Sequence, residues 1–267
     1  MSELPQIGLG TWQNTDPADC RSSVETALEL GYRHVDTAHF YENEQHVGEG
    51  LAKADVPRDE LTIGTKVHAE RFGLTYEAII EGTEASLERL GVEYIDLLYV
   101  HWPVGDYDPA ETMAAFDELR DRGVIREICL SNFSVGLLDD ARAQLNAELF
   151  AHQVEMHPLL DQSTLLEYAQ EHDHYLVAYS PLARGAVFEI PELQAIASAH
   201  DVSEAQVSLA WLLSKANVRV IPKASSKSHL RDNLNALDLE LTDAEIEQIN
   251  SIERTERFIT RDGAPWE

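Results

Sequence analysis

Asp36, Tyr41, Lys66 and His101 are side chains whose types, taken together, could carry out acid–base chemistry. A tyrosine hydroxyl is a weak acid whose pKa in water is about 10. The ammonium of Lys66 would stabilise the phenolate and is expected to lower that pKa, while Asp36 could keep Lys66 in place and charged. A neutral His101 could donate a hydrogen bond to a substrate oxygen. The set suits general acid catalysis on a polar C=O bond, with hydride supplied by a cofactor.

Each of these residues also has a plainer explanation when taken alone. Asp36 and Lys66 could form a buried ion pair, His101 could belong to the core, and Tyr41 could be an ordinary loop residue. Their positions favour catalysis, because polar residues recur at the ends of the expected strands, where β/α barrels carry their catalytic groups. The polar residues at these ends are Asp36, Lys66, His101, Ser131, Asn132, Gln153, Tyr179, Ser180 and Lys223.

Short β-rich runs alternate with longer helical patterns along the chain. Several of these runs are continuously apolar, which is typical of parallel strands covered on both faces. The expected strands are QIGLGTW (6–12), RHVDTA (33–38), ELTIGTKV (60–67), YIDLLYVHW (94–102), REICLSN (126–132), FAHQVEM (150–156), YLVAYSP (175–181) and VRVIPKA (218–224).

Start and stop signals mark the helices between these runs. The segment 16–31 opens with an Asp and a Pro and ends at Gly31, and the segment 74–91 ends at Gly91 in the same way. In the segment 241–253 a Thr is followed three residues later by a Glu, which predicts a capping box. Further helices are expected at 109–123, 134–145 and 203–216.

Eight such alternations predict an α/β fold, a single-domain (β/α)8 TIM barrel over residues 1–267. The length is usual for this barrel. A doubly wound parallel sheet is the alternative. Its dinucleotide fingerprint is incomplete, because Gly8 and Gly10 are followed by Thr11, Trp12 and Gln13 without a third glycine.

The composition is strongly acidic, with 48 Asp and Glu against 20 Lys and Arg and a formal net charge of −28. Only five of the basic residues are lysines. Such self-repulsion destabilises a compact state in dilute salt but is screened at molar ionic strength, where the Debye length is roughly 3 Å. We therefore expect a salt-adapted, halophilic protein; an ordinary acidic cytosolic protein is the alternative. Nucleic acid and anionic membranes are not expected as partners, because the field repels phosphate.

The cysteine pattern and the start of the chain bear on the compartment. Cys20 and Cys129 are far apart and form neither a metal-ligand spacing nor a disulfide framework. The opening MSELPQIGLGTW has no signal-peptide pattern, and no apolar run reaches the roughly 20 residues needed to span a bilayer. We expect a cytoplasmic protein that acts as a monomer on a small carbonyl compound.

The segment around Asp36 and Tyr41 is similar to a known family signature. GYRHVDTAHFYENE (31–44) resembles the signature of the aldo-keto reductases, with Asp36 and Tyr41 at its fixed spacing. The resemblance spans nearly the whole chain and implies a (β/α)8 barrel. The further motifs are IGLGTW (7–12), TK (65–66), DLLYVHWP (96–103), SNF (131–133), QVEMHP (153–158), AYSPL (178–182), IPKASS (221–226) and LTDAEIEQI (241–249).

The resemblance implies a role for each matching residue. Tyr41 would be the proton donor, with Asp36, Lys66 and His101 completing a catalytic tetrad. The substrate would meet Trp12, Tyr41, His101 and Trp102. Tyr179 would stack on the nicotinamide; Ser131, Asn132 and Gln153 would bind its carboxamide; and Ser180, Leu182 and Gly185 would line the pyrophosphate. The remaining cofactor contacts would be Gly10, Thr11, Asp36, Lys223 at a 2′-phosphate, Ser225, His229, Asp232 and Asn233.

Departures from the family pattern bear on cofactor and substrate. Ala224 stands where the family usually has a serine, and His229 where it usually has an arginine, so NADPH is the expected cofactor but NADH remains open. The segment after Trp102 and the tail after Ile252 are short. In this they resemble compact prokaryotic members that reduce 2,5-diketo-D-gluconate, methylglyoxal and other small aldehydes.

Other functions stay open at this point. A reductase-like barrel could act as a regulatory, cofactor-sensing subunit without turnover. Lys66 could form a Schiff base, although pairing with Asp36 would keep it protonated. A metal hydrolase would need ligands such as His152, His157, His172 and His174, which form no convincing cluster, so no metal is expected.

Overall fold

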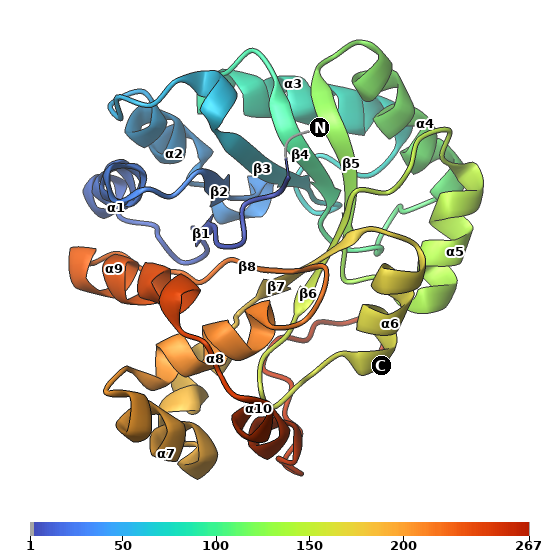
Figure 1. The fold of residues 1–267 in the computed structure, drawn as a ribbon. Coiled ribbons are helices and arrows are strands. Elements are labelled where there is room, and N and C mark those ends of the chain that lie inside the picture. Colours follow the sequence, from blue (N-terminus) through green and yellow to red (C-terminus); the bar gives the residue numbers. More distant parts are fainter. Residues whose placement is uncertain (1–2, 267) are drawn as a thin grey trace.

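The computed structural model describes residues 3–266, and its centre is a barrel of parallel strands in sequential order. Each strand pairs with the next along the chain, and helices surround the barrel (Figure 1). The strands are β1 (Leu9–Gly10), β2 (His34–Asp36), β3 (Thr62–Val67), β4 (Ile95–Val100), β5 (Ile125–Ser131), β6 (Ala151–Glu155), β7 (Tyr175–Tyr179) and β8 (Val218–Val220).

Parallel bridges join the last strand back to the start of the chain. Ile7 pairs with Val220 and Gly10 pairs with Lys223. The backbone N–H of Gly8 donates to the Val220 carbonyl at 2.8 Å. A side chain at Gly10 would not fit, because a Cβ there would lie 2.6 Å from the carbonyl oxygen of Ile221. The predicted (β/α)8 TIM-barrel fold is confirmed, and each expected strand overlaps an observed one, although β5 begins at Ile125, one residue before the expected strand 126–132.

The helices that the sequence predicted are present with the expected ends. Asp16 accepts backbone N–H groups at the start of the first helix, Gly31 and Gly91 end two helices in the left-handed conformation, and Thr242 and Glu245 form the capping box. These helices are α1 (Pro17–Leu30), α3 (Tyr76–Leu90), α4 (Pro109–Asp121), α5 (Val135–Gln144), α8 (Glu204–Leu213) and α10 (Asp243–Asn250). The sequence did not delimit α2 (Glu44–Leu51), α6 (Ser163–Glu171), α7 (Pro191–His200) or α9 (Lys227–Asn235).

The barrel wall separates an inner from an outer core, because successive strand residues face opposite sides. On β4, Leu97 and Tyr99 belong to the inner cluster, whereas Leu98 and Val100 belong to the larger cluster that includes the helices. The core therefore fixes the direction of every strand side chain, including the polar ones at the strand ends.

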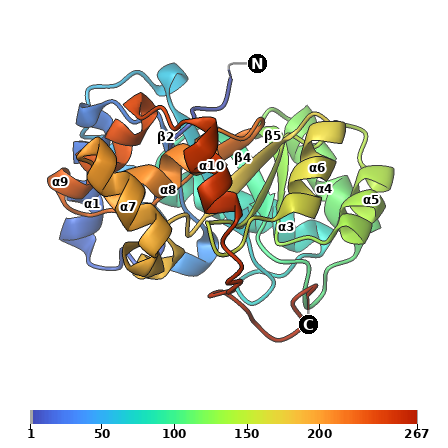
Figure 2. The same ribbon diagram turned by 60° about the horizontal axis from the view of Figure 1, so that its bottom comes forward.

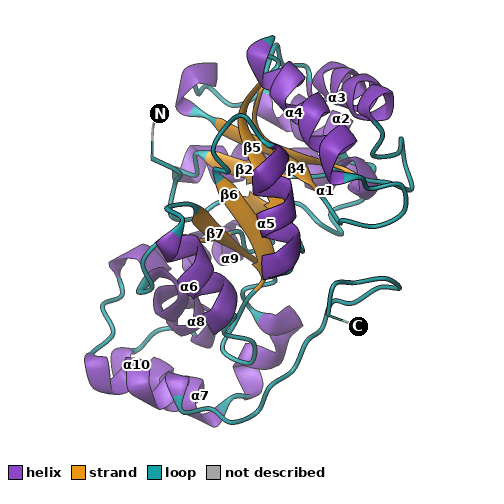
Figure 3. Cartoon of the chain, turned by 90° about the vertical axis from the view of Figure 1, so that its right-hand side faces the viewer, coloured by secondary structure: helices purple, strands orange, loops and turns teal. Residues whose placement is uncertain are grey.

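The two ends of the barrel carry different parts of the chain. The N-terminal segment and the C-terminal segment emerge at opposite ends (Figure 2). After α10 the chain has no helix or strand and runs as an extended loop past the barrel (Figure 3). Among the described residues, no helix is both long and apolar enough to cross a membrane.

Candidate functional site

A cavity of about 490 Å³ opens at the C-terminal ends of the strands and is lined by Asp36, Tyr41 and His101 of the predicted tetrad. Lys66 is not part of the lining but pairs with Asp36. All the expected substrate-contacting residues line the cavity, together with about half of the expected cofactor residues. Its lining includes Gly10, Thr11, Trp12, Asp36, Tyr41, His101, Trp102, Asn132, Gln153, Tyr179, Ser180 and Lys223. The chain brings these residues together because parallel strands all end on the same face of the barrel.

Asp36 and Lys66 form a buried ion pair at the floor of the cavity. Both side chains are at most 2% exposed, and Lys66 Nζ donates to one Asp36 carboxylate oxygen and to the Thr37 carbonyl at 2.8 Å. Gln153 Nε2 donates to the other Asp36 oxygen at 2.8 Å. Burial lowers the pKa of Lys66, and the Asp36 carboxylate opposes that shift. A lysine fixed in this way serves better as a local positive charge than as a nucleophile.

Tyr41 comes from the short 3-10 turn His39–Tyr41 that follows β2. The Lys66 ammonium lies 5.2 Å from the centre of its ring. Contrary to the expectation from sequence, the pKa of Tyr41 is raised well above its usual value, because burial and the nearby Asp36 and Tyr179 disfavour the phenolate. The lysine does not outweigh desolvation here. The hydroxyl therefore stays protonated at neutral pH and is available as a donor.

His101 follows β4, and its ring meets the Tyr41 ring edge-on with the centres 5.6 Å apart. Burial lowers the pKa of His101 well below 6.5, and the positive charge of Lys66 lowers it further. The imidazole is therefore neutral at physiological pH. A neutral ring carries one N–H, so it can donate a single hydrogen bond to a substrate oxygen.

A hydrogen-bonded network connects Tyr179, Asn132 and His101 in the wall of the cavity. Tyr179 donates its hydroxyl proton to Asn132 Oδ1 at 2.8 Å, and Asn132 Nδ2 donates to the His101 carbonyl at 2.9 Å. Ser131 Oγ donates to the Gln153 carbonyl at 2.9 Å. Asn132 has a φ of 64°, a left-handed conformation that is uncommon for a residue other than glycine. The network fixes the ring plane of Tyr179, so the wall is rigid enough to take a flat aromatic group such as nicotinamide.

Some of the expected cofactor residues lie outside this cavity. Ser131, Leu182, Gly185, Ser225, His229, Asp232 and Asn233 are not part of its lining. Ser225 and His229 are exposed and follow Lys223 into α9. Asp232 accepts from Ser203 Oγ at 2.7 Å and from Gln206 Nε2 at 2.6 Å, so its carboxylate holds α9 against α8.

The segment after β7 is suited to phosphate. Ser180, Arg184 and Gly185 have positive φ angles of 47°, 53° and 99°. Turn conformations of this kind can form anion-binding concavities, although the Gly185 N–H already donates to the Leu182 carbonyl at 2.8 Å. Together with the exposed ammonium of Lys223, this segment makes the residues present compatible with a dinucleotide phosphate.

The cavity also contains residues that sequence reasoning missed. Phe40 and His68 stack with ring centres 4.6 Å apart, and His68 lies 5.2 Å from His101. His68 could have been found, because it lies two residues after Lys66 and so faces the same side of the strand. Residues 259–262 of the tail also line the cavity, and no local sequence pattern predicts this position.

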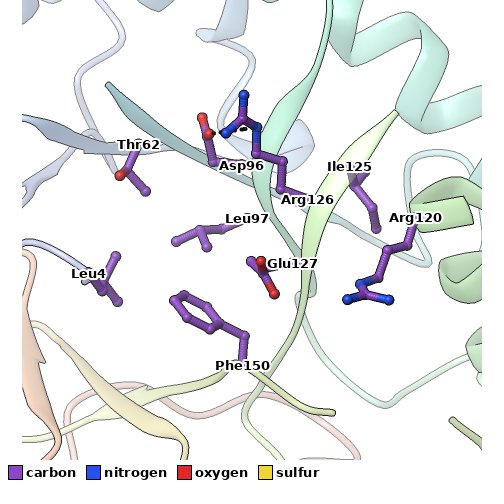
Figure 4. Close-up of a pocket in the computed structure, with 9 residues that line it drawn as sticks. All are labelled: Leu4, Thr62, Asp96, Leu97, Arg120, Ile125, Arg126, Glu127 and Phe150. Atoms are coloured by element: carbon purple, nitrogen blue, oxygen red, sulfur yellow. Dashed lines mark ion pairs between the residues drawn. The ribbon is translucent and has the colours of Figure 1, made fainter. Parts of the chain in front are cut away.

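A second cavity, of about 420 Å³, lies at the opposite end of the barrel (Figure 4). It is lined by residues at the N-terminal ends of strands, such as Thr62 and Asp96, and by apolar side chains such as Leu4 and Phe150. Asp96 pairs with Arg58 at 2.6 Å and with Arg126 at 3.6 Å, so its charge is already compensated. In β/α barrels, residues at this end usually contribute to stability and not to catalysis.

Within residues 3–266, no group of three His, Cys, Asp or Glu side chains is placed to hold an ion. His152 accepts the backbone N–H of Phe133 at 3.1 Å, and His157 contacts Glu155 at 3.1 Å.

The amino-acid sequence is similar to those of known reductases. The chain is 36% identical over 263 residues to the methylglyoxal reductase DkgB of Escherichia coli O157:H7, covering 97% of each protein. It is 37% identical over 258 residues to the 9,11-endoperoxide prostaglandin H2 reductase of Trypanosoma cruzi, covering 96% of this chain and 90% of that protein.

Among solved structures, the barrel is similar to that of MGS-M4, an aldo-keto reductase from a deep-sea metagenome library. The TM-score is 0.92 with 32% identity, over 97% of this chain and 95% of that one. The sequence profile of the aldo/keto reductase family matches residues 6–254. The chain therefore belongs to the aldo/keto reductase family.

Proposed function

We propose that this protein reduces small aldehydes and ketones to alcohols with NADPH as the hydride donor and Tyr41 as the proton donor. The observation that carries the proposal is the convergence of Tyr41, His101 and the Asp36–Lys66 pair on one cavity at the strand ends. The relatives named above are reductases, which supports the same class of reaction.

Each side chain of the tetrad has a separate role at the carbonyl oxygen. Nicotinamide, when bound, supplies the hydride to the carbonyl carbon. Tyr41, which burial keeps protonated, donates its proton to the oxygen as negative charge develops there. The Lys66 ammonium stabilises the tyrosinate that remains, and Asp36 holds Lys66 in position. Neutral His101 donates a hydrogen bond to the same oxygen and so orients the substrate.

Cofactor choice depends on the positive groups around α9. Lys223, Lys227 and Arg231 are exposed in a protein whose net charge is −28, so they form a local exception to the acidic field. A 2′-phosphate near the start of α9 would meet these groups, which favours NADPH over NADH. A small substrate such as methylglyoxal, which one relative's name specifies, would fit beside the aromatic walls Trp12 and Trp102.

The deciding experiment compares wild-type protein with the Tyr41→Phe variant in molar KCl. We expect NADPH oxidation with methylglyoxal or benzaldehyde in the wild type, and a loss of about a hundredfold or more in kcat in the variant, because general acid catalysis is removed. NADPH binding, followed by fluorescence, should be nearly unchanged. Tyr94→Phe removes a hydroxyl outside the cavity and serves as the matched control.

Two results would contradict the proposal. Turnover by Tyr41→Phe at the wild-type rate would exclude Tyr41 as the donor. A wild-type protein that binds NADPH but reduces no carbonyl compound would favour the regulatory, cofactor-sensing alternative.

A further inference from the structure

Residues 256–262, which we call the strap, form one side of the cavity through residues 259–262, and β6 anchors them. The backbone N–H groups of Phe258 and Ile259 donate to Glu155 Oε1 and Oε2 at 2.7 and 3.0 Å. Arg257 lies 3.9 Å from the same carboxylate, and the Glu256 N–H donates to the Leu159 carbonyl at 2.8 Å. Both oxygens of one carboxylate therefore hold consecutive amides of a segment about a hundred residues further along the chain.

Glu155 is an unusual group to find at this position. Its side chain is 0% exposed, and an ionised carboxylate buried without partners is very unfavourable. The strap supplies two of its N–H donors, and His157 adds a contact at 3.1 Å. The two strap amides stabilise the buried carboxylate, and the carboxylate in turn holds the strap. Release of the strap would therefore remove two hydrogen bonds from a buried charge.

The far end of the strap forms part of the substrate pocket. Ile259, Thr260 and Arg261 line the cavity. Arg261 Nη1 contacts His68 Nε2 at 2.7 Å, and the same guanidinium pairs with Glu70. Arg261 thereby places strap atoms beside the ring that stacks on Phe40 and meets His101 edge-on.

The tail beyond the strap reaches a second wall of the pocket. Arg257 lies over the Trp266 ring, 4.0 Å from its centre, and the Trp266 and Trp102 rings are 5.3 Å apart. Trp102 is one of the residues that line the cavity. The position of the strap therefore determines the shape of the pocket on two sides.

We propose that Glu155 is a positioning residue: it fixes the strap beside the cavity and so sets the affinity for the carbonyl substrate without touching it. The kinetic part of this inference rests on the proposed reductase function. The strap that Glu155 holds contacts His68 and ends near Trp102, whereas the expected dinucleotide contacts at Ser180 and Lys223 follow β7 and β8.

The test is Glu155→Gln, which keeps the shape of the side chain. Its NH2 group cannot accept a hydrogen bond, so one of the two strap N–H donors loses its acceptor. We expect KM for methylglyoxal and benzaldehyde to rise about tenfold, the effect of losing one charge-assisted hydrogen bond, with a smaller change in kcat. The dissociation constant of NADPH should be unchanged. Trypsin should cleave faster after Arg257 and Arg261, and this readout needs no turnover.

Asp117→Asn is the matched control. Asp117 is also buried and accepts the backbone N–H of a loop residue, Asn146, at 2.9 Å, but it lies on α4 and does not line the cavity. It should lower the melting temperature without changing KM for the carbonyl compound. If Glu155→Gln does not fold, Arg261→Gln can be used, because it removes the contacts of the strap with His68 and Glu70. This variant should also raise KM.

The possible outcomes separate the two proposals. A wild-type protein without reductase activity would refute the proposed function. Unchanged trypsin cleavage in Glu155→Gln, or an unchanged KM in an active and folded variant, would refute the role of Glu155. A rise in KM that Asp117→Asn reproduces would mean that general destabilisation, not the strap, is responsible.

Discussion

At the scale of single residues, burial controls the chemistry more than neighbouring charges do. Tyr41 lies near an ammonium, yet its pKa is raised because desolvation of the phenolate dominates. His101 keeps a neutral ring for the same reason. Burial thus favours a protonated tyrosine and a neutral histidine, the protonation states on which the proposed carbonyl reduction depends.

Buried histidines make stability depend on pH. Burial lowers the pKa of His34, His39 and His174 from 6.5 to about 4. In the unfolded chain these groups bind protons near pH 6.5, so the folded state binds fewer protons between pH 6.5 and 4. The stability they contribute is present above pH 6.5 and is lost as the pH falls toward 4.

The expected measurement is a falling free energy of unfolding in urea across that pH window, at constant molar KCl. His174→Gln should remove up to about one proton from the pH dependence, because between pH 6.5 and 4 the buried His174 binds a proton mainly in the unfolded chain. A slope that is identical in the variant and the wild type would show that His174 does not titrate in this way.

At the scale of elements, sequence patterns located the strands better than the helices. Most strands lie in β-rich runs, several of them continuously apolar, and the capped helices α1, α3 and α10 carry clear end signals. The helix α9 is mostly polar, and its buried residues are Leu230 and Asn233, so it has little periodic signal. The helix α6 begins after Gln162 without a side-chain cap. Tertiary packing, and not local propensity, stabilises such helices.

The composition of α9 leads to a prediction on cofactor choice. His229→Arg should strengthen NADPH binding about tenfold relative to NADH, because a guanidinium can form a bidentate contact with phosphate. Binding titrations with both cofactors measure the ratio. Asn235→Arg adds the same charge at the other end of the helix and should have little effect. An equal gain from both variants would point to general electrostatics instead of a site at His229.

At the scale of the whole molecule, the negative charge predicts dependence on salt. At a net charge of −28 the carboxylates repel one another in dilute buffer, and molar salt screens this repulsion. We expect the melting temperature to fall, with loss of activity, on transfer from molar to millimolar KCl. Calorimetry and circular dichroism would measure it, and an unchanged melting temperature would refute the salt-adaptation hypothesis.

A charge-reversal variant provides the control for this effect. Replacing the exposed Glu29, Glu77 and Glu240 by lysine changes the net charge from −28 to −22, since each substitution adds two charges. The variant should depend less steeply on KCl than the wild type. An identical dependence would mean that salt acts through another route, such as strengthened apolar burial.

The amino-acid sequence by itself determined the barrel and was sufficient to propose the tetrad. Eight apolar runs alternating with helical segments allow few other topologies, and all parallel strands end on one face, so polar residues at those ends must converge. Only the tertiary structure decided the sign of the Tyr41 pKa shift and the course of the strap beside the cavity. Desolvation depends on every neighbour in space, and the contact of Glu155 with Phe258 joins residues about a hundred positions apart, which no local pattern records.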